Sequence, residues 1–227
     1  MTSKAVDDRV KIVGSLRQML EMHQFELVGP LVARLFPGDA AETFEVTAML
    51  QAHLDVLSRA EEAMLVADEE LIAEADDDQQ YRDARDEAVK RVRRALMDAA
   101  GLLEAAYGVE LLEHYALSHE EPARAPEILQ SHAEEVVAAM RTRELVESSP
   151  YGFDLELGPV ADRLETELVP LAIALEDIRR EAREIREALA KRNAAVEDFD
   201  ETYRAVSEMV HACFLMVNRP DLAAMIQ

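Results

Sequence analysis

Apolar residues recur every three or four positions along most of the chain. The most regular run alternates steps of four and three residues without a slip, and it comprises Leu157, Ala161, Leu164, Leu168, Leu171, Leu175, Ile178, Ala182, Ile185 and Leu189. This spacing predicts an amphipathic helix with a heptad seam of the coiled-coil type. The charged residues between these positions are expected to form a solvated face with i,i+4 ion pairs. Pro170 lies inside the seam and is expected to kink the helix.

Glycine and proline are scarce and clustered, and their positions divide the chain into helical segments. Between these clusters, Ala, Leu, Glu and Arg predict six helices, over residues 3–28, 40–75, 79–107, 125–147, 160–192 and 195–218. The sequence predicts breaks at Gly29–Pro30, at Gly108 and at Pro220. It also predicts tight polar turns at Asp76–Gln79 and Ala194–Glu197.

The two halves of the chain can be aligned at one offset of 118 positions. This offset places Val46 on Leu164, Leu50 on Leu168, and Tyr81 on Phe199. Two interpretations remain open: an internal duplication, or the general likeness of two helical hairpins. With duplication, residues 1–109 and 125–227 form two helical repeat units joined by a linker over residues 110–124.

The expected fold is all-α: an elongated antiparallel bundle of about six helices, built from two related long hairpins. Such a bundle often dimerises to bury more surface.

Composition narrows the functional classes. The 227 residues include 47 acidic and 24 basic side chains, giving a formal net charge of −23. An ordinary nucleic-acid or anionic-membrane partner is disfavoured, because such surfaces need Lys and Arg. The apolar fraction of 49% is too high for a disordered acidic tail. The single cysteine, Cys213, and the lack of a signal-peptide pattern favour a cytoplasmic protein.

Several short motifs appear in a recognisable order along the chain. They are Phe36–Gly38, Ala67–Asp68, Arg82–Asp86, Ala105–Glu110, Phe199–Arg204 and Arg219–Ala223. In this arrangement the chain resembles a group of uncharacterised bacterial helical proteins that share a Tyr-Gly after the third helix and a Leu-Ala near the C-terminus. The resemblance implies a bacterial origin and a helical fold, and it implies no activity, cofactor or site residue.

No catalytic or metal-binding pattern emerges from the sequence. A di-iron bundle needs two Glu-x-x-His pairs, whereas only Glu208–His211 occurs. A loop site from His114, His119, Glu120 and Glu121 lacks an ordered framework. Cys213 and His211 point about 200° apart on a helix, so they cannot act together. We therefore expect no enzyme and no cofactor.

Two further features have structural interpretations. His53 lies in an apolar seam and is expected to be a core histidine, which would lower stability below about pH 6 if it were buried. The basic stripe Lys90–Arg94 has acidic neighbours, so we expect its cations to form ion pairs within the chain or at an interface.

Acidic residues crowd one end of the first predicted long hairpin. They form a predicted docking surface for a partner protein with a basic surface, made of Glu61, Glu62, Asp68, Glu69, Glu70, Glu74, Asp76, Asp77 and Asp78. Nine of the ten methionines offer adaptable packing, although core filling is the commoner use of methionine. The leading hypothesis is a non-enzymatic adaptor, scaffold or regulatory subunit. The alternatives are an acidic inhibitor that mimics DNA, and a bundle enzyme or sensor with an internal metal or small ligand.

Overall fold

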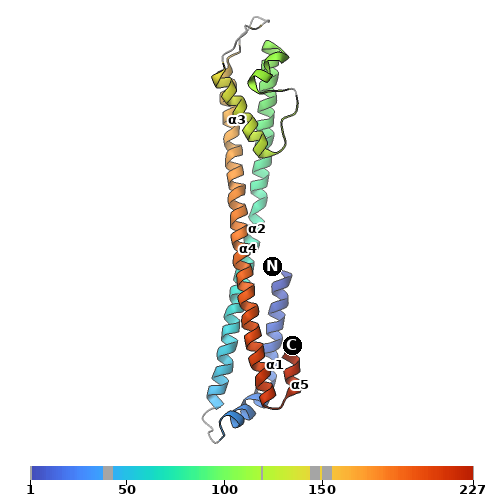
Figure 1. Ribbon diagram of the computed structural model, residues 1–227, viewed down its shortest axis with the longest axis vertical. Helices are drawn as coiled ribbons and strands as arrows, with labels where there is room; N and C mark the ends of the chain where they lie inside the picture. Colours follow the sequence, from blue (N-terminus) through green and yellow to red (C-terminus); the bar gives the residue numbers. More distant parts are fainter. Residues whose placement is uncertain (1, 38–42, 119, 144–148, 150–154, 227) are drawn as a thin grey trace. The chain divides into compact units, whose positions relative to one another are not determined.

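The computed structural model describes residues 2–37, 43–118, 120–143, 149 and 155–226 (Figure 1). Five α-helices and three short 3₁₀ turns account for the regular structure of these residues. The α-helices are α1 (Lys4–Leu35), α2 (Thr43–Tyr107), α3 (Pro126–Thr142), α4 (Leu157–Met216) and α5 (Pro220–Ala223). The turns are η2 (Val109–Leu111), η3 (Glu113–Tyr115) and η4 (Ala224–Ile226). No strand occurs in this part of the chain, so the predicted all-α class is confirmed.

Three predicted helix breaks are wrong. Helix α1 continues through Gly29–Pro30, and α2 and α4 continue through the predicted turns at Asp76–Gln79 and Ala194–Glu197. Pro30 is tolerated because the surrounding Leu27, Val28, Leu31 and Val32 are buried. The burial of each such side chain contributes roughly 1.5–3 kcal/mol, which offsets the lost hydrogen bond.

The heptad register explains why the long helices do not break. In α4, steps of seven residues from Leu157 reach Leu164, Leu171, Phe199 and Cys213, all of them buried. In α2 the same step from Val46 reaches buried positions at residues 60, 67, 88 and 95. A turn would shift this register, so both predicted turn segments are parts of a continuous helix.

Other predicted boundaries are confirmed. Helix α2 ends at Tyr107, and Gly108 follows with φ 90°, a conformation that favours glycine at a helix C-terminus. Helix α3 begins with Pro126 and α5 with Pro220, where a missing backbone N–H costs little. Pro170 lies within α4 without ending it.

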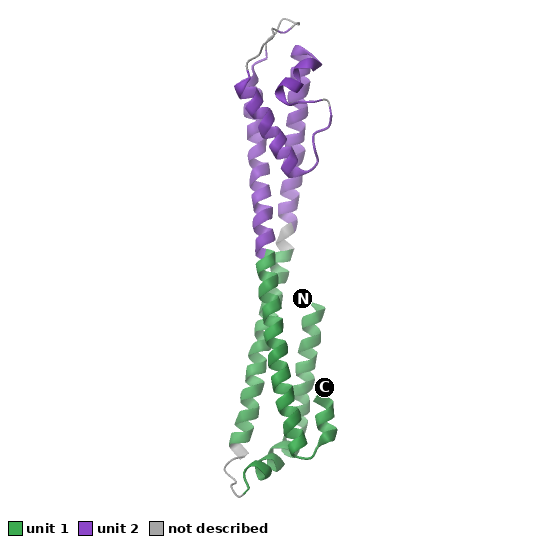
Figure 2. Ribbon diagram, in the orientation of Figure 1, with its two compact units in different colours: residues 1–75, 185–227 green, residues 76–184 purple. Residues whose placement is uncertain are grey.

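The chain divides into two compact units (Figure 2). Unit 1 comprises residues 1–75 and 185–227, and unit 2 comprises residues 76–184. These units differ from the predicted repeat units, because α2 and α4 each contribute residues to both. Each unit nevertheless combines a shorter helix (α1 or α3), the start of one long helix, the end of the other, and a short helical segment. This recurring order agrees with the 118-residue offset, and duplication stays a prediction.

Unit 2 has its own apolar core around α3. Leu129, Ala133, Val136 and Met140 recur at helical spacing on α3 and are buried. They pack with the end of α2 and the start of α4, whose contributions include Val92, Ala95, Leu103, Leu164 and Leu171. The predicted seam is thus confirmed from Leu157 to Leu175.

Unit 1 has a separate core around α1. Val13, Leu20 and Leu27 of α1 pack with the start of α2 and the end of α4. The C-terminal α5 and η4 add buried side chains from Leu222, Ala223 and Ile226. Figure 1 shows α5 lying beside α1 and the end of α4.

Part of the predicted α4 seam is wrong. Ala182 and Leu189 are exposed, whereas Glu181 is buried. Both exposed residues lie outside the two apolar clusters. In each cluster a third helix, α1 or α3, packs against the long helices. Heptad spacing therefore predicted which positions share a face but not where a covering helix buries that face.

The continuity of α4 makes a testable prediction at Ala194, an exposed position in the predicted turn. Ala194→Pro should lower the free energy of unfolding by about 3 kcal/mol or more, because proline removes a backbone hydrogen bond and clashes with the preceding helical turn. The matched variant Ala194→Ser keeps the N–H and should cost less than about 1 kcal/mol. Denaturant unfolding followed by circular dichroism measures both. Equal stability of the proline variant and the native chain would contradict a continuous helix.

Candidate functional site

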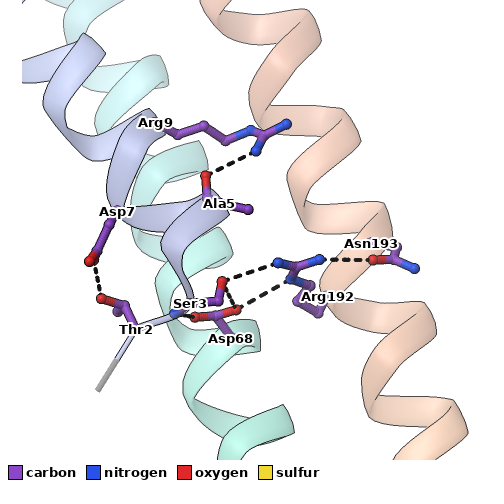
Figure 3. Close-up of polar contacts among 8 residues, drawn as sticks. All are labelled: Thr2, Ser3, Ala5, Asp7, Arg9, Asp68, Arg192 and Asn193. Carbon is purple, nitrogen blue, oxygen red and sulfur yellow. Dashed lines mark hydrogen bonds and ion pairs between the residues drawn. The ribbon is translucent and has the colours of Figure 1, made fainter.

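A buried carboxylate joins three helices of unit 1 (Figure 3). Asp68 of α2 is only 1% exposed, and it accepts hydrogen bonds from Ser3 at the start of α1. The Ser3 backbone N donates to Oδ2 at 2.6 Å and the Ser3 Oγ to Oδ1 at 2.7 Å. Arg192 of α4 lies 3.3 Å from Oδ1 through its Nε, and its Nη2 donates to Ser3 Oγ at 3.1 Å. These contacts attach the first turn of α1 to both long helices.

The electrostatics of Asp68 favour its charged form. Burial alone would raise the pKa of this carboxyl, but the hydrogen bonds from Ser3 and Arg192 outweigh burial and lower the pKa below its usual value. The N-terminus of α1 adds a favourable helix dipole beside the carboxylate. Asp68 is therefore a paired, charged residue whose bonds replace the water that burial removes.

Further ion pairs attach α1 along its length. Arg17 donates to Glu61 of α2 at 2.6 Å and to Ser58 at 2.9 Å, and Glu61 is buried. Arg9 binds Asp200 of α4 through two hydrogen bonds, at 2.8 and 2.7 Å. These bonds lower the pKa of the Asp200 carboxyl. Since both Arg9 and Asp200 are partly exposed, this pair contributes at most about 1 kcal/mol.

The predicted acidic docking surface is therefore corrected in part. Glu61 and Asp68 are buried and bonded within unit 1, so they stabilise the fold and cannot form an exposed surface. Glu62 and Glu69 are exposed, Glu74 is half-buried, and Glu70 is exposed beside the Lys191 ammonium. The side chains of Asp76, Asp77 and Asp78 lie outside the described residues. A docking role for the exposed acids stays a prediction.

The remaining sequence candidates occupy structural positions. Cys213 is buried in the unit 1 core, and burial raises the pKa of its thiol, as expected of an unreactive cysteine. His53 is only half-buried, so the expectation of a core histidine is wrong. Its Nδ1 lies 2.7 Å from the Met49 carbonyl one turn earlier. His211 Nδ1 lies 3.0 Å from the Ala223 carbonyl and so holds the C-terminal segment.

The basic stripe forms ion pairs within unit 2. Arg93 binds Glu121 at 2.9 Å, Arg91 lies 3.7 Å from Glu167, and Lys90 lies 3.5 Å from Glu87. The expectation of pairing within the chain is confirmed for these three cations. Glu121, one of the four residues considered for a loop site, is thus bonded to Arg93, and His119 of that set lies outside the described residues.

An apolar groove of about 400 Å³ opens on the surface of unit 1. We call it the methionine groove; its lining is Ile12, Ser15, Leu16, Gln18, Met19 and Met22 of α1, Tyr203 of α4, and Met225 and Ile226 of η4. This lining contains no charged side chain, so its chemistry is apolar contact with a few hydroxyl and amide groups. Ile12, Met22 and Met225 are 46%, 61% and 65% exposed, respectively.

Sequence reasoning identified the methionines but not this groove. Met19 and Met22 belong to one helix face, whereas Tyr203 and Met225 come from about 180 and 200 residues later in the chain. The available signal was the helical spacing of Ile12, Met19 and Met22 on α1. Met19 belongs to the core, and the exposed Ile12 and Met22 extend this apolar face onto the surface.

Comparison with known proteins identifies no relative. The chain matches no protein-family model, no curated protein and no solved structure. Among the described residues, no helix is long and apolar enough to cross a membrane.

The Asp68 contacts predict a specific dependence of stability on pH. The lowered pKa of Asp68 means that its contribution is present above the unfolded-state pKa of about 3.9 and is lost as pH falls through the folded-state pKa. Asp68→Asn should therefore cost about 1–3 kcal/mol at pH 7, and the difference from the native chain should shrink as pH falls below about 4. Unfolding free energies measured across this range test the prediction.

The neighbouring Glu69→Gln is the matched control. Glu69 is exposed, so its variant should differ from the native chain by less than about 0.5 kcal/mol throughout. A stability difference for Asp68→Asn that stayed constant across the acidic range would contradict the assigned role of the carboxylate.

Proposed function

We propose that this protein is a non-enzymatic interaction protein, an adaptor, scaffold or regulatory subunit, that binds another protein through the methionine groove of unit 1. The observation that carries the proposal is the exposed apolar surface of this groove. Contiguous exposed apolar surface rimmed by polar residues is typical of a protein-binding site. Methionine side chains are flexible and polarisable, and therefore suit a surface that adapts to a partner.

The polar residues around α1 support this proposal. Arg9, Arg17 and Arg192 each bind a carboxylate of unit 1, and these contacts fix α1 against α2 and α4. A binding groove on a helix held in this way loses less conformational entropy when the partner binds. The alternative function, an acidic inhibitor that mimics DNA, requires exposed carboxylates. The burial of Glu61 and Asp68 removes two carboxylates from the surface.

We also propose a cytoplasmic location and a bacterial origin. The location is supported by the single, buried Cys213, which has no partner for a disulfide within the chain. The origin is supported by the resemblance of the motifs to bacterial helical proteins.

Site-specific cross-linking tests the binding function. Met22 would be replaced with the photo-cross-linking residue p-benzoylphenylalanine, in the full chain expressed at native level in its source organism. The exposed groove position should give a discrete cross-linked species that contains another protein. Mass spectrometry of this species identifies the partner.

Val169 of α4 provides a matched position, because it is a comparably exposed apolar residue at 58% and belongs to unit 2. The same cross-linker there should capture little of this partner. The proposal fails if position 22 gives no cross-linked protein, or if both positions capture the same proteins with equal yield.

A further inference from the structure

The groove face of α1 has its own regular spacing. Asp8, Ile12, Ser15, Met19, Met22 and Glu26 follow one another in alternating steps of four and three residues. This face has apolar and small residues in the middle and a carboxylate at each end. From Ile12 to Met22 it extends about 15 Å, which matches roughly three turns of a second helix.

The shape and lining of the groove suit a helical occupant. An amphipathic helix presents apolar side chains at the same steps of three and four, so they can insert between those of α1. Across the groove, Tyr203 of α4 and Met225 of η4 supply the opposite wall. Phe25, which is 92% exposed one turn after Met22, extends the apolar contact surface.

The charge of unit 1 indicates the chemistry of that helix. Residues 1–75 and 185–227 contain 21 acidic and 11 basic side chains. The carboxylates at the two ends of the groove face are paired, Asp8 with Lys11 at 3.4 Å and Glu26 with Arg219, which also binds Asp221 at 2.8 Å. The negative charge that a partner would meet is therefore the overall acidic excess of unit 1. A second copy of the chain would bring another net charge of −23 to the interface.

We propose that the occupant of the methionine groove is a cationic amphipathic helix of a partner protein. Its apolar face contacts the exposed Ile12 and Met22 above the buried Met19, and its Lys or Arg residues lie toward the excess carboxylates of unit 1 around the groove. Electrostatic complementarity of this kind speeds association and excludes acidic competitors. This inference rests on the proposed function, since it specifies the partner that the same groove binds.

Synthetic peptides test the chemistry of the occupant on the purified full chain. The first is a Leu/Lys peptide of about 18 residues, long enough for five helical turns, with leucines in steps of three and four. The second has Glu in place of Lys, and the third has the Leu/Lys composition in scrambled order. Fluorescence anisotropy should show the first binding at least about tenfold more tightly than the other two, and more weakly as salt is raised.

Two variants locate the binding. Met22→Gln should weaken the Leu/Lys peptide about tenfold, because it removes apolar contact in the groove. Val169→Gln is the matched control and should leave affinity within about twofold. Both positions are exposed, and circular dichroism verifies that both variants fold.

Several results would overturn the inference. Equal binding of the Leu/Glu or the scrambled peptide excludes a cationic amphipathic helix, and an unchanged affinity of Met22→Gln excludes the groove. Self-association of the chain that Met22→Gln abolishes would assign the groove to a second copy. If the Leu/Lys peptide does not bind while cross-linking at position 22 still captures a protein, only the proposed cationic amphipathic helix is wrong. If cross-linking also fails, the proposed function is wrong.

Discussion

The buried carboxylate of Asp68 is the contact that positions the start of α1 against both long helices. An ionised carboxylate that is almost fully buried is costly unless charged or polar groups replace its water. Ser3 and Arg192 provide that replacement, and they come from α1 and α4 while Asp68 belongs to α2. Because the bonds are directional, the first turn of α1 has a defined position against both long helices. The same contacts therefore help to position the core residues of α1 and the groove residues on its exposed side.

The groove lies on the exposed side of the same helix. One face of α1 is buried through Val13, Leu20 and Leu27, and the face that carries Ile12 and Met22 remains on the surface. The C-terminal segment closes one side of the groove, since Ile226 is buried in the core and Met225 is exposed. His211 and Arg34 hold this end through the carbonyls of Ala223 and Met216. Surface chemistry and core packing are thus coupled through α1.

Much of the fold could be predicted from the spacing of apolar residues. Helix formation, the seam from Leu157 to Leu175 and the helix end at Gly108 follow from local physical chemistry. The predicted turns are wrong because a short polar stretch alone does not end a helix. The register contained the contrary signal: from Leu71 the steps of three and four reach Tyr81 without a shift, and the same holds from Leu189 to Phe199.

The site was less predictable. Glu61 and Asp68 are seven residues apart and adjacent to the buried Ala60 and Ala67, which could have placed both carboxylates at the edge of the core. Their partners, Arg17, Ser3 and Arg192, are set by tertiary packing and have no local signature. The groove likewise needs residues from both ends of the chain.

Amide hydrogen exchange tests most directly whether Asp68 positions α1. In Asp68→Asn, amides of residues 4–13 should exchange about tenfold faster than in the native chain, because the first turns of α1 lose their attachment and open locally. Amides of α3, which belongs to unit 2, serve as the internal reference and should be unchanged. Unchanged exchange in residues 4–13, or an equal increase in α1 and α3, would contradict this account.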